Sequence, residues 1–182
     1  VTNSQGNTLL HLDKNALLNY ENWQLPENNQ IVLSPKGLFI SDFKLEHEGR
    51  SISAQSQTPN ANAPIALAFE NFDIQTLSSM VEKDDWQMSG KINGTTVVKN
   101  IATQPLFTSD INIDAFTFKK EGVGDFVIQI KNEKQNQYDA HVALTGQEND
   151  VQLNGTYSSQ NDSFDLKLAI EKLNMKSIQG FS

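Results

Sequence analysis

Apolar and polar residues alternate along most of the chain, which is the pattern of β-strands that bury one face. The clearest run lies at 126–130, where Phe126, Ile128 and Ile130 alternate with Val127 and Gln129. Similar runs recur through the rest of the sequence, and Asn, Asp, Gly and Pro residues separate them. The pattern predicts a mainly β protein, with about a dozen antiparallel strands that have one apolar and one polar face.

The spacing of apolar residues changes from that of a strand to that of a helix in two stretches. Residues 73–83 begin with Asp73 and residues 174–181 begin with Asn174, and both residue types favour the first position of a helix. Each stretch follows a run of strand-like alternation. We therefore expect two short helices, each directly after a strand.

These two stretches align with one another. Residues 67–80 match residues 168–181 at an offset of 101 positions (168 − 67 = 101), and the apolar positions coincide. The strands before them match at an offset of 99, so that Leu45 meets Leu144 (144 − 45 = 99). Chance alternation explains matching strands, but it does not easily explain a strand-to-helix change in the same register. The alignment therefore indicates an internal repeat.

The repeat predicts the organisation of the chain. We expect a first β-repeat over 1–83 and a second over 84–182, each ending in a short helix, which together form one continuous elongated domain. Because the sequence stops at a repeat boundary, we also expect the chain to be a piece of a longer protein.

Composition and charge argue against several partners. The net charge is −8, and Lys119-Lys120 is the only adjacent basic pair, so we expect no nucleic-acid partner. The longest apolar runs are a few residues, far below the roughly 20 that cross a membrane, so we expect no membrane span in this chain.

The residue types that carry catalysis or bind metals are sparse. The sequence has no cysteine, and its three histidines, His11, His47 and His141, show no metal-ligand spacing. We expect each histidine to lie in a strand and face solvent. Because no set of nucleophile, base and acid can be assembled, we predict no enzymatic activity, no catalytic residue, no metal site and no cofactor.

Several segments resemble the TamB family, more broadly the AsmA-like proteins of the bacterial envelope. The resemblance rests on the strand-to-helix step from Phe69 to Leu77, on the strand from Trp86 to Gly94, and on the strands at 124–128 and 144–157. The Asn- and Lys-rich composition suits a Bacteroidetes-type member.

The resemblance implies a fold and a function. Members of this family have a β-taco, which is a long curved antiparallel sheet, U-shaped in section, with an apolar inner groove. They are anchored in the inner membrane and extend through the periplasm. Their proposed roles are to move phospholipid to the outer membrane and to support outer-membrane protein assembly with a barrel partner. By this resemblance, the chain is a periplasmic segment of such a bridge protein.

The alternating apolar residues are the candidate lining of a groove for phospholipid acyl chains. The candidates are Ile111, Ile113, Phe116, Phe118, Phe126, Ile128, Ile130, Val142, Leu144, Val151 and Leu153.

The same alternation would build the closed core of an ordinary sandwich, so two other functions stay open. One is a scaffold that pairs with unfolded strands through a sheet edge. The other is a non-catalytic sandwich or barrel that binds a hydrophobic ligand, a glycan or a protein.

Overall fold

The structure is a computed structural model that describes residues 6–79, 87–103 and 105–179. The N-terminal strands are short: β1 (Thr8–Leu10), β2 (Asn15–Leu18), β3 (Glu21–Gln24), β4 (Gln30–Ser34), β5 (Gly37–Ser41), β6 (Phe43–His47) and β7 (Arg50–Ser56). The later strands are longer: β8 (Ile65–Asp73), β9 (Met88–Lys99), β10 (Leu106–Phe118), β11 (Glu121–Lys134), β12 (Gln137–Gly146), β13 (Asn149–Ser158) and β14 (Ser163–Lys172).

Two short helices complete the described part of the chain. Helix α1 (Ile74–Ser79) follows β8, and helix α2 (Met175–Gln179) follows β14. The prediction of a mainly β protein with two short helices is therefore confirmed. The expected helical stretches also included 80–83 and 180–181, which lie outside the described residues.

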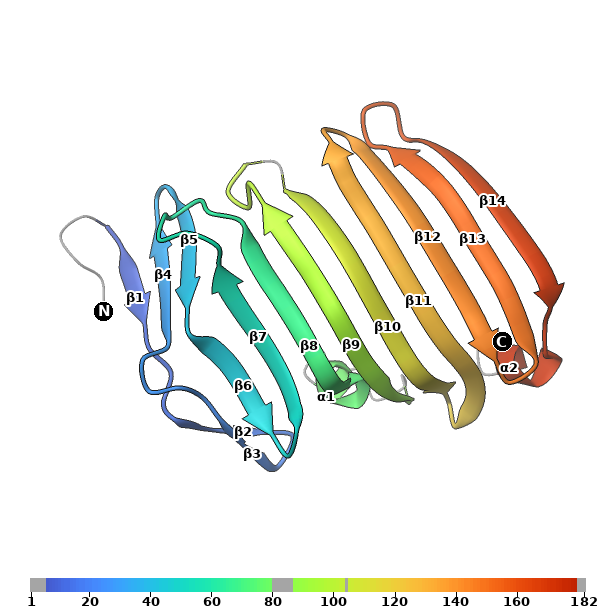
Figure 1. The fold of residues 1–182 in the computed structure, drawn as a ribbon, viewed down its shortest axis with the longest axis horizontal. Coiled ribbons are helices and arrows are strands. Elements are labelled where there is room, and N and C mark those ends of the chain that lie inside the picture. The colour runs from blue at the N-terminus through green and yellow to red at the C-terminus, as the bar shows by residue number, and fades with distance from the viewer. Residues whose placement is uncertain (1–5, 80–86, 104, 180–182) are drawn as a thin grey trace.

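Most strands form one large antiparallel sheet. Its order is β14-β13-β12-β11-β10-β9-β8-β7-β6-β3-β2, and a second sheet has the order β1-β4-β5. The long strands lie side by side in a row, and both helices lie at the same end of these strands (Figure 1). The sheet is open, because β14 and β2 are its two edges. This open order does not fit the closed barrel that was one alternative.

Tight turns connect neighbouring strands and fix their register. Glu48 (φ 46°) and Gly49 (φ 76°) join β6 to β7, and Gln147 (φ 50°) and Glu148 (φ 63°) join β12 to β13. Positive φ at both central residues is the mark of the two-residue hairpin turn that matches the twist of the strands. The two turns also lie 99 positions apart (147 − 48 = 99).

Other elements repeat at the offsets found in the sequence. Strand β7 begins at Arg50 and β13 at Asn149 (149 − 50 = 99), while α1 begins at Ile74 and α2 at Met175 (175 − 74 = 101). The sheet continues without a break from one copy to the next, because β8 pairs with β9.

The main hydrophobic core lies at the N-terminal end of the large sheet. Trp23 is 0% exposed and packs with its ring 5.5 Å from that of Phe72, which is 1% exposed. Leu25, Leu45 and Ile92 complete the buried cluster, and side chains of α1 pack against it. The β2–β3 hairpin and α1 thus cover one part of the apolar face.

A second cluster covers a neighbouring part of the same face. Ile40 of β5 packs against Ala54 and Ile65, and Leu38 of β5 and Ile31 of β4 contact this cluster. The backbone N–H of Ile40 also donates a hydrogen bond to Ser56 Oγ at 2.9 Å. Strands β2 to β5 therefore cover much of the apolar face of β6 to β9.

One glycine allows the strands at the centre of the sheet to approach closely. Gly94 lies between Phe69 and Ile111 in the pairing of β8, β9 and β10. Its φ is +128°, and a Cβ there would lie 2.1 Å from the carbonyl oxygen of Asp110. A side chain at this position would force β9 and β10 apart, which explains the glycine.

The packing predicts unequal effects for two phenylalanines on the apolar face. Phe72→Ala should lower the free energy of unfolding by about 3–5 kcal/mol, because it opens a cavity in the core. Phe164→Ala should change it by about 0.5 kcal/mol or less, because Phe164 is 69% exposed. Urea unfolding followed by circular dichroism measures both. Equal losses would contradict the uneven packing described above.

Candidate functional site

The predicted groove residues form rows that run across neighbouring strands. In the central row, Ile111 lies opposite Ile128, Ile128 opposite Val142, and Val142 opposite Leu153. Directly opposed residues point to the same face of a sheet, so these side chains form one continuous apolar strip. Leu168 of β14 extends the strip, because it pairs with Leu153.

A second row lies two residues away along the strands. Ile113 pairs with Phe126, Phe126 with Leu144, and Leu144 with Val151. Ile170 of β14 extends it through its pairing with Val151. Two residues further along β11 from the central row, Ile130 begins a third row, in which it pairs with Ala140.

Phe116 and Phe118 reach this face after an irregularity in β10. The register shifts between Ile113 and Phe116, where Ala115 has a φ of 51° and its N–H donates to Asp125 Oδ1 at 2.7 Å. The shift keeps Phe116 on the apolar side, because its ring lies 5.4 Å from that of Phe126. Phe118 lies two residues further along β10, so its side chain points to the same face as that of Phe116.

This surface has several members beyond the predicted groove residues. Phe107 and Tyr138 have ring centroids 5.6 Å apart, and Tyr138 and Tyr157 have centroids 6.0 Å apart. Tyr157 pairs with Phe164 in turn, which gives an aromatic fourth row. The outermost members come from β14: Phe164, Leu166, Leu168 and Ile170. The strict alternation of these four residues in the sequence is the signal that could have added them to the predicted groove. We call the apolar side chains of β10–β14 the open apolar face.

Exposure increases across the open apolar face towards β14. Phe116 is buried, and the other predicted groove residues of β10–β13 are half-buried. On β14, Leu166, Leu168 and Ile170 are 55%, 58% and 51% exposed. Ile111 and Ile113 pack against the buried cluster around Trp23 and Phe72, whereas the side chains of β14 are exposed, so this face opens to solvent towards β14.

The open apolar face is comparable in size to the largest apolar patch of a typical monomeric protein. Residue spacing along strands and spacing between strands give four rows over five strands dimensions of about 20 Å by 20 Å, or about 400 Å². The largest apolar patch of a monomeric protein measures about 300–600 Å² and often has a function. The open apolar face is therefore of functional size.

The opposite face of the same strands is polar and internally bonded. Asp110 accepts a hydrogen bond from Gln129 at 3.4 Å, and Thr156 donates to Asp139 at 2.8 Å. His141 Nδ1 lies 2.6 Å from Asn154 Oδ1. These pairs satisfy the polar groups across strands, which leaves the apolar side as the surface still to be covered.

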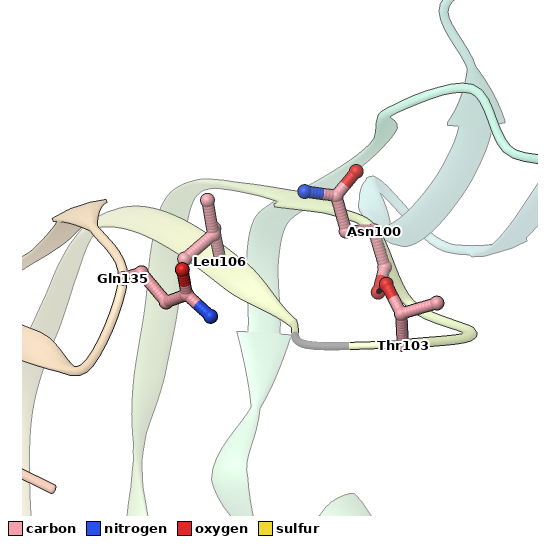
Figure 2. A pocket seen from close by; sticks show the side chains of 4 residues that line it. All are labelled: Asn100, Thr103, Leu106 and Gln135. Carbon is pink, nitrogen blue, oxygen red and sulfur yellow. Dashed lines mark hydrogen bonds between the residues drawn. The ribbon is translucent and has the colours of Figure 1, made fainter. Parts of the chain in front are cut away.

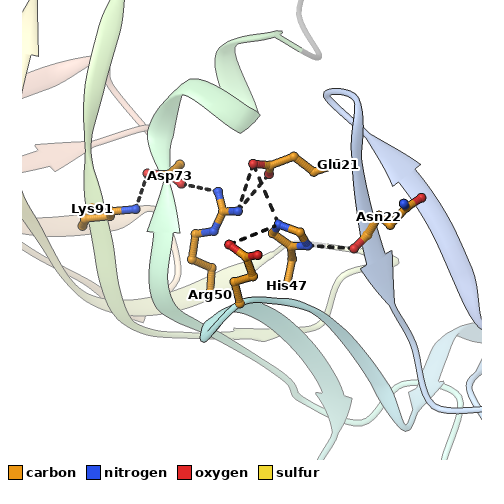
Figure 3. Close-up of polar contacts among 7 residues, drawn as sticks. Glu21, Asn22, His47, Arg50, Asp73 and Lys91 are labelled. Carbon is orange, nitrogen blue, oxygen red and sulfur yellow. Dashed lines mark hydrogen bonds and ion pairs between the residues drawn. The ribbon is translucent and has the colours of Figure 1, made fainter.

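A charged cluster closes the covered end of the apolar face (Figure 3). Arg50 Nη2 lies 3.0 Å from Glu21, and Arg50 Nη1 lies 2.6 Å from Asp73 Oδ2. Lys91 forms an ion pair with the other oxygen of Asp73, and the Arg50 guanidinium lies 5.4 Å from the centre of the Trp23 ring. The cluster joins β3, β7, the end of β8 and β9, so its contacts serve to hold strands together.

The cluster shifts the pKa values of its members. Burial opposes ionisation of Asp73, but hydrogen bonds from Lys91 and Arg50 outweigh burial and hold the pKa of this carboxyl below its usual value. The hydrogen bond with Glu21, together with that to Asp73, raises the pKa of Arg50 despite burial. These charges are therefore fixed around neutral pH and carry no proton-transfer role.

The prediction that the histidines lie in strands and face solvent is wrong for two of them. The His47 ring lies 5.4 Å from that of Trp23, and its Nδ1 is 2.7 Å from the carbonyl oxygen of Asn22. Only 18% of its side chain is exposed, because the β2–β3 hairpin folds over the end of β6. His11 is exposed, but it follows β1 instead of lying in it.

Two shallow pockets lie at the opposite end of the strands from the charged cluster. One is lined by Asn100, Thr103, Leu106 and Gln135, from the β9–β10 and β11–β12 connections (Figure 2). Its lining is two amides, a hydroxyl and one aliphatic side chain, which is not a set that activates a nucleophile. Among the described residues, no group of His, Asp and Glu side chains could hold a metal ion.

The described helices include none with the length and apolar character of a membrane span. Comparisons with protein-family models, with curated proteins and with solved structures find no match to this chain. The open apolar face is therefore interpreted from its own geometry.

The charged cluster predicts a pH-dependent effect of Asp73→Asn. The stability that this carboxylate contributes is present above its unfolded pKa of about 3.9 and is lost as pH falls through its lower folded pKa. The variant should lose about 1–3 kcal/mol of unfolding free energy at pH 7, and the difference should shrink below about pH 4.

Chemical denaturation from pH 7 to pH 3 measures this difference. Glu46→Gln is the control, because the Glu46–Lys44 ion pair is largely exposed and should contribute about 0.5 kcal/mol or less. A loss for Asp73→Asn that is the same at both pH values would contradict the assignment.

Proposed function

We propose that the open apolar face binds the acyl chains of phospholipids, and that the chain is a segment of an envelope bridge protein of the TamB type. The observation that carries the proposal is the apolar strip from Ile128 to Leu168, which crosses the four strands β11–β14 in register and becomes exposed at β14. A soluble β protein normally buries such a strip against a second layer. Here the second layer covers β6–β9.

The chemistry of the strip suits an acyl chain. Its central rows present aliphatic and phenylalanine side chains, and each methylene that leaves water gains about 0.8 kcal/mol. A surface without directional polar contacts holds a chain in many equivalent positions. Such a surface therefore favours movement of a lipid along the rows over tight binding at one point.

The open apolar face is also continuous with the covered region. The central row passes from Ile111 through Gly94 to Phe69 and Ile52. Repetition of such units would align the rows of successive copies into a longer strip. A strip of this kind is what transfer of lipid between two membranes requires.

The remaining parts of the proposal come from the family resemblance. A bridge protein of this type is anchored in the inner membrane and lies in the periplasm, so this segment would lie there. Support for outer-membrane protein assembly, with a barrel partner, would involve other parts of such a protein. The proposal includes no catalytic step and no cofactor.

A second candidate function is glycan binding at the aromatic row. Tyr138 and Tyr157 are neighbours on the open apolar face, and Phe107 adjoins them. Aromatic rings of this kind stack on sugars as well as on acyl chains. The row occupies one end of the face, whereas the aliphatic rows occupy the centre, so lipid remains the better match.

Site-specific photo-crosslinking tests the lipid proposal. A benzophenone amino acid at Ile128, Val142 or Leu153, in the protein expressed in the bacterial periplasm, should capture phospholipid that mass spectrometry identifies. The same group at Val127, Gln129 or Gln152 should not, because these residues point to the polar face. Val127 controls for apolar character, since it is a neighbour of Ile128 with a similar side chain.

A charge placed on either face provides the matched variants. Val142→Asp should reduce capture from Leu153 by about tenfold or more, because a carboxylate is costly to bury beside an acyl chain. Ala143→Asp, one residue away on the other face, should leave capture unchanged. Equal capture from both faces, or none from either, would overturn the proposal. Capture of glycan instead would favour the second candidate.

A further inference from the structure

The edge of the sheet at β14 is the most exposed apolar feature of the described chain. Strand β14 pairs with β13 on one side, and no described strand pairs with its other side (Figure 1). It is ten residues long and contains no proline. From Phe164 to Ile170 its charged residues alternate with the apolar ones, so they lie on the polar face and the apolar side of this stretch carries no charge. A long edge strand with an exposed apolar side is a template for pairing with another strand.

The internal repeat identifies what such an edge normally holds. Strand β8 is the counterpart of β14, since Leu67 corresponds to Leu168 (168 − 67 = 101). The equivalent edge of β8 is occupied by β9, with Leu67 opposite Thr96 and Phe69 opposite Gly94. The counterpart edge is therefore built for antiparallel pairing.

The second copy keeps the supporting structure of the first. Thr76 in α1 and Ser177 in α2 are equivalent (177 − 76 = 101) and are 2% and 1% exposed. Ser177 Oγ donates to the carbonyl oxygen of Gly122 at 3.0 Å and accepts a hydrogen bond from Asn149 at 2.9 Å. These contacts fix α2 beside the end of β11, so the geometry around β14 is already formed.

The polar side of β14 also matches a strand like β9. In the β8–β9 pair, Ile65 lies opposite Val98. The next residue of β9, Lys99, is therefore in register with residue 64, which precedes Ile65. Residue 64 corresponds to Asp165 in the second repeat (165 − 64 = 101). In a β9-type strand paired with β14, the lysine would therefore lie opposite the Asp165 carboxylate. Opposite charges across strands stabilise a pair, whereas like charges oppose it.

We propose that the free edge of β14 binds an antiparallel β-strand of the β9 type. Such a strand has apolar or small residues on one face, a glycine opposite Ile170, and a basic residue opposite Asp165. It would extend the sheet and continue the apolar rows beyond Leu168 and Ile170. This binding does not depend on lipid, so it goes beyond the proposed function.

Disulfide trapping tests the pairing and its register. The chain has no cysteine, so Leu168→Cys introduces a single thiol on an exposed strand. The probe is a synthetic peptide with the β9 sequence, Met88–Lys99, that carries Thr96→Cys. Residues directly opposed in an antiparallel pair lie within disulfide range, so this adduct should form on the order of tenfold faster than adducts of peptides with Thr95→Cys or Val97→Cys.

A second thiol pair lies on the polar face, away from any apolar adsorption. Ala68 lies opposite Thr95, so Ala169→Cys should react preferentially with the Thr95→Cys peptide. The measurements use lipid-free protein, and circular dichroism checks that each variant is folded. Register-specific adducts at both positions support the proposal, whatever the result of the lipid experiment.

Two outcomes would overturn the proposal. One is an absence of adducts, or equal rates for the three peptides, which would mean that β14 does not select a β9-type strand. The other is faster formation of Leu168→Cys dimers than of peptide adducts, which would mean that a second copy of the chain occupies the edge.

Discussion

The two-residue period of a β-strand puts most apolar side chains of the large sheet on one of its faces, and that face must be covered. The chain covers it unevenly. Strands β2–β5 and α1 bury much of the apolar side of β6–β9 around Trp23 and Phe72. In the strands from β10 to β14, Ile111 and Ile113 contact that cluster and α2 packs beside the end of β11, but the apolar side chains of β14 are exposed. Stability is therefore concentrated at one end of the sheet and exposed apolar surface at the other.

This division explains why the polar contacts differ between the two repeats. In the first, Arg50 and Asp73 form a charged cluster that is partly buried under the β2–β3 hairpin. In the second, the equivalent residues are Asn149 and Asn174, and the N–H of Asn174 donates to Asn149 Oδ1 at 2.7 Å. The contact between the start of β7 or β13 and the start of the following helix is therefore made by charged groups in the first repeat and by neutral amides in the second. Where this contact is also covered by Trp23, the ion pairs compensate one another's burial.

The sequence predicted the parts of the fold that depend on local periodicity. Alternation placed Ile111, Ile128, Val142 and Leu153 on one face, and the repeat located the starts of α1 and α2. It did not predict which part of the face is covered, because an open groove and a closed core need the same alternation. It also missed the burial of His47, since the contact with Trp23 joins residues that are far apart in the sequence. Non-local packing of this kind leaves no periodic signal.

The open apolar face and the free edge of β14 have a common physical origin. In the first half of the sheet both surfaces are covered: β2–β5 pack on the apolar face of β6–β9, and β9 pairs with the edge of β8. The second repeat keeps the same turn, helix start and strand-to-helix contact, yet its last strand presents Leu168 and Ile170 to solvent. The hydrogen-bonded strands continue through both halves of the sheet, so the surfaces at β14 are formed although they are not covered. Apolar chains can add to its face and a strand to its edge without any rearrangement of the protein.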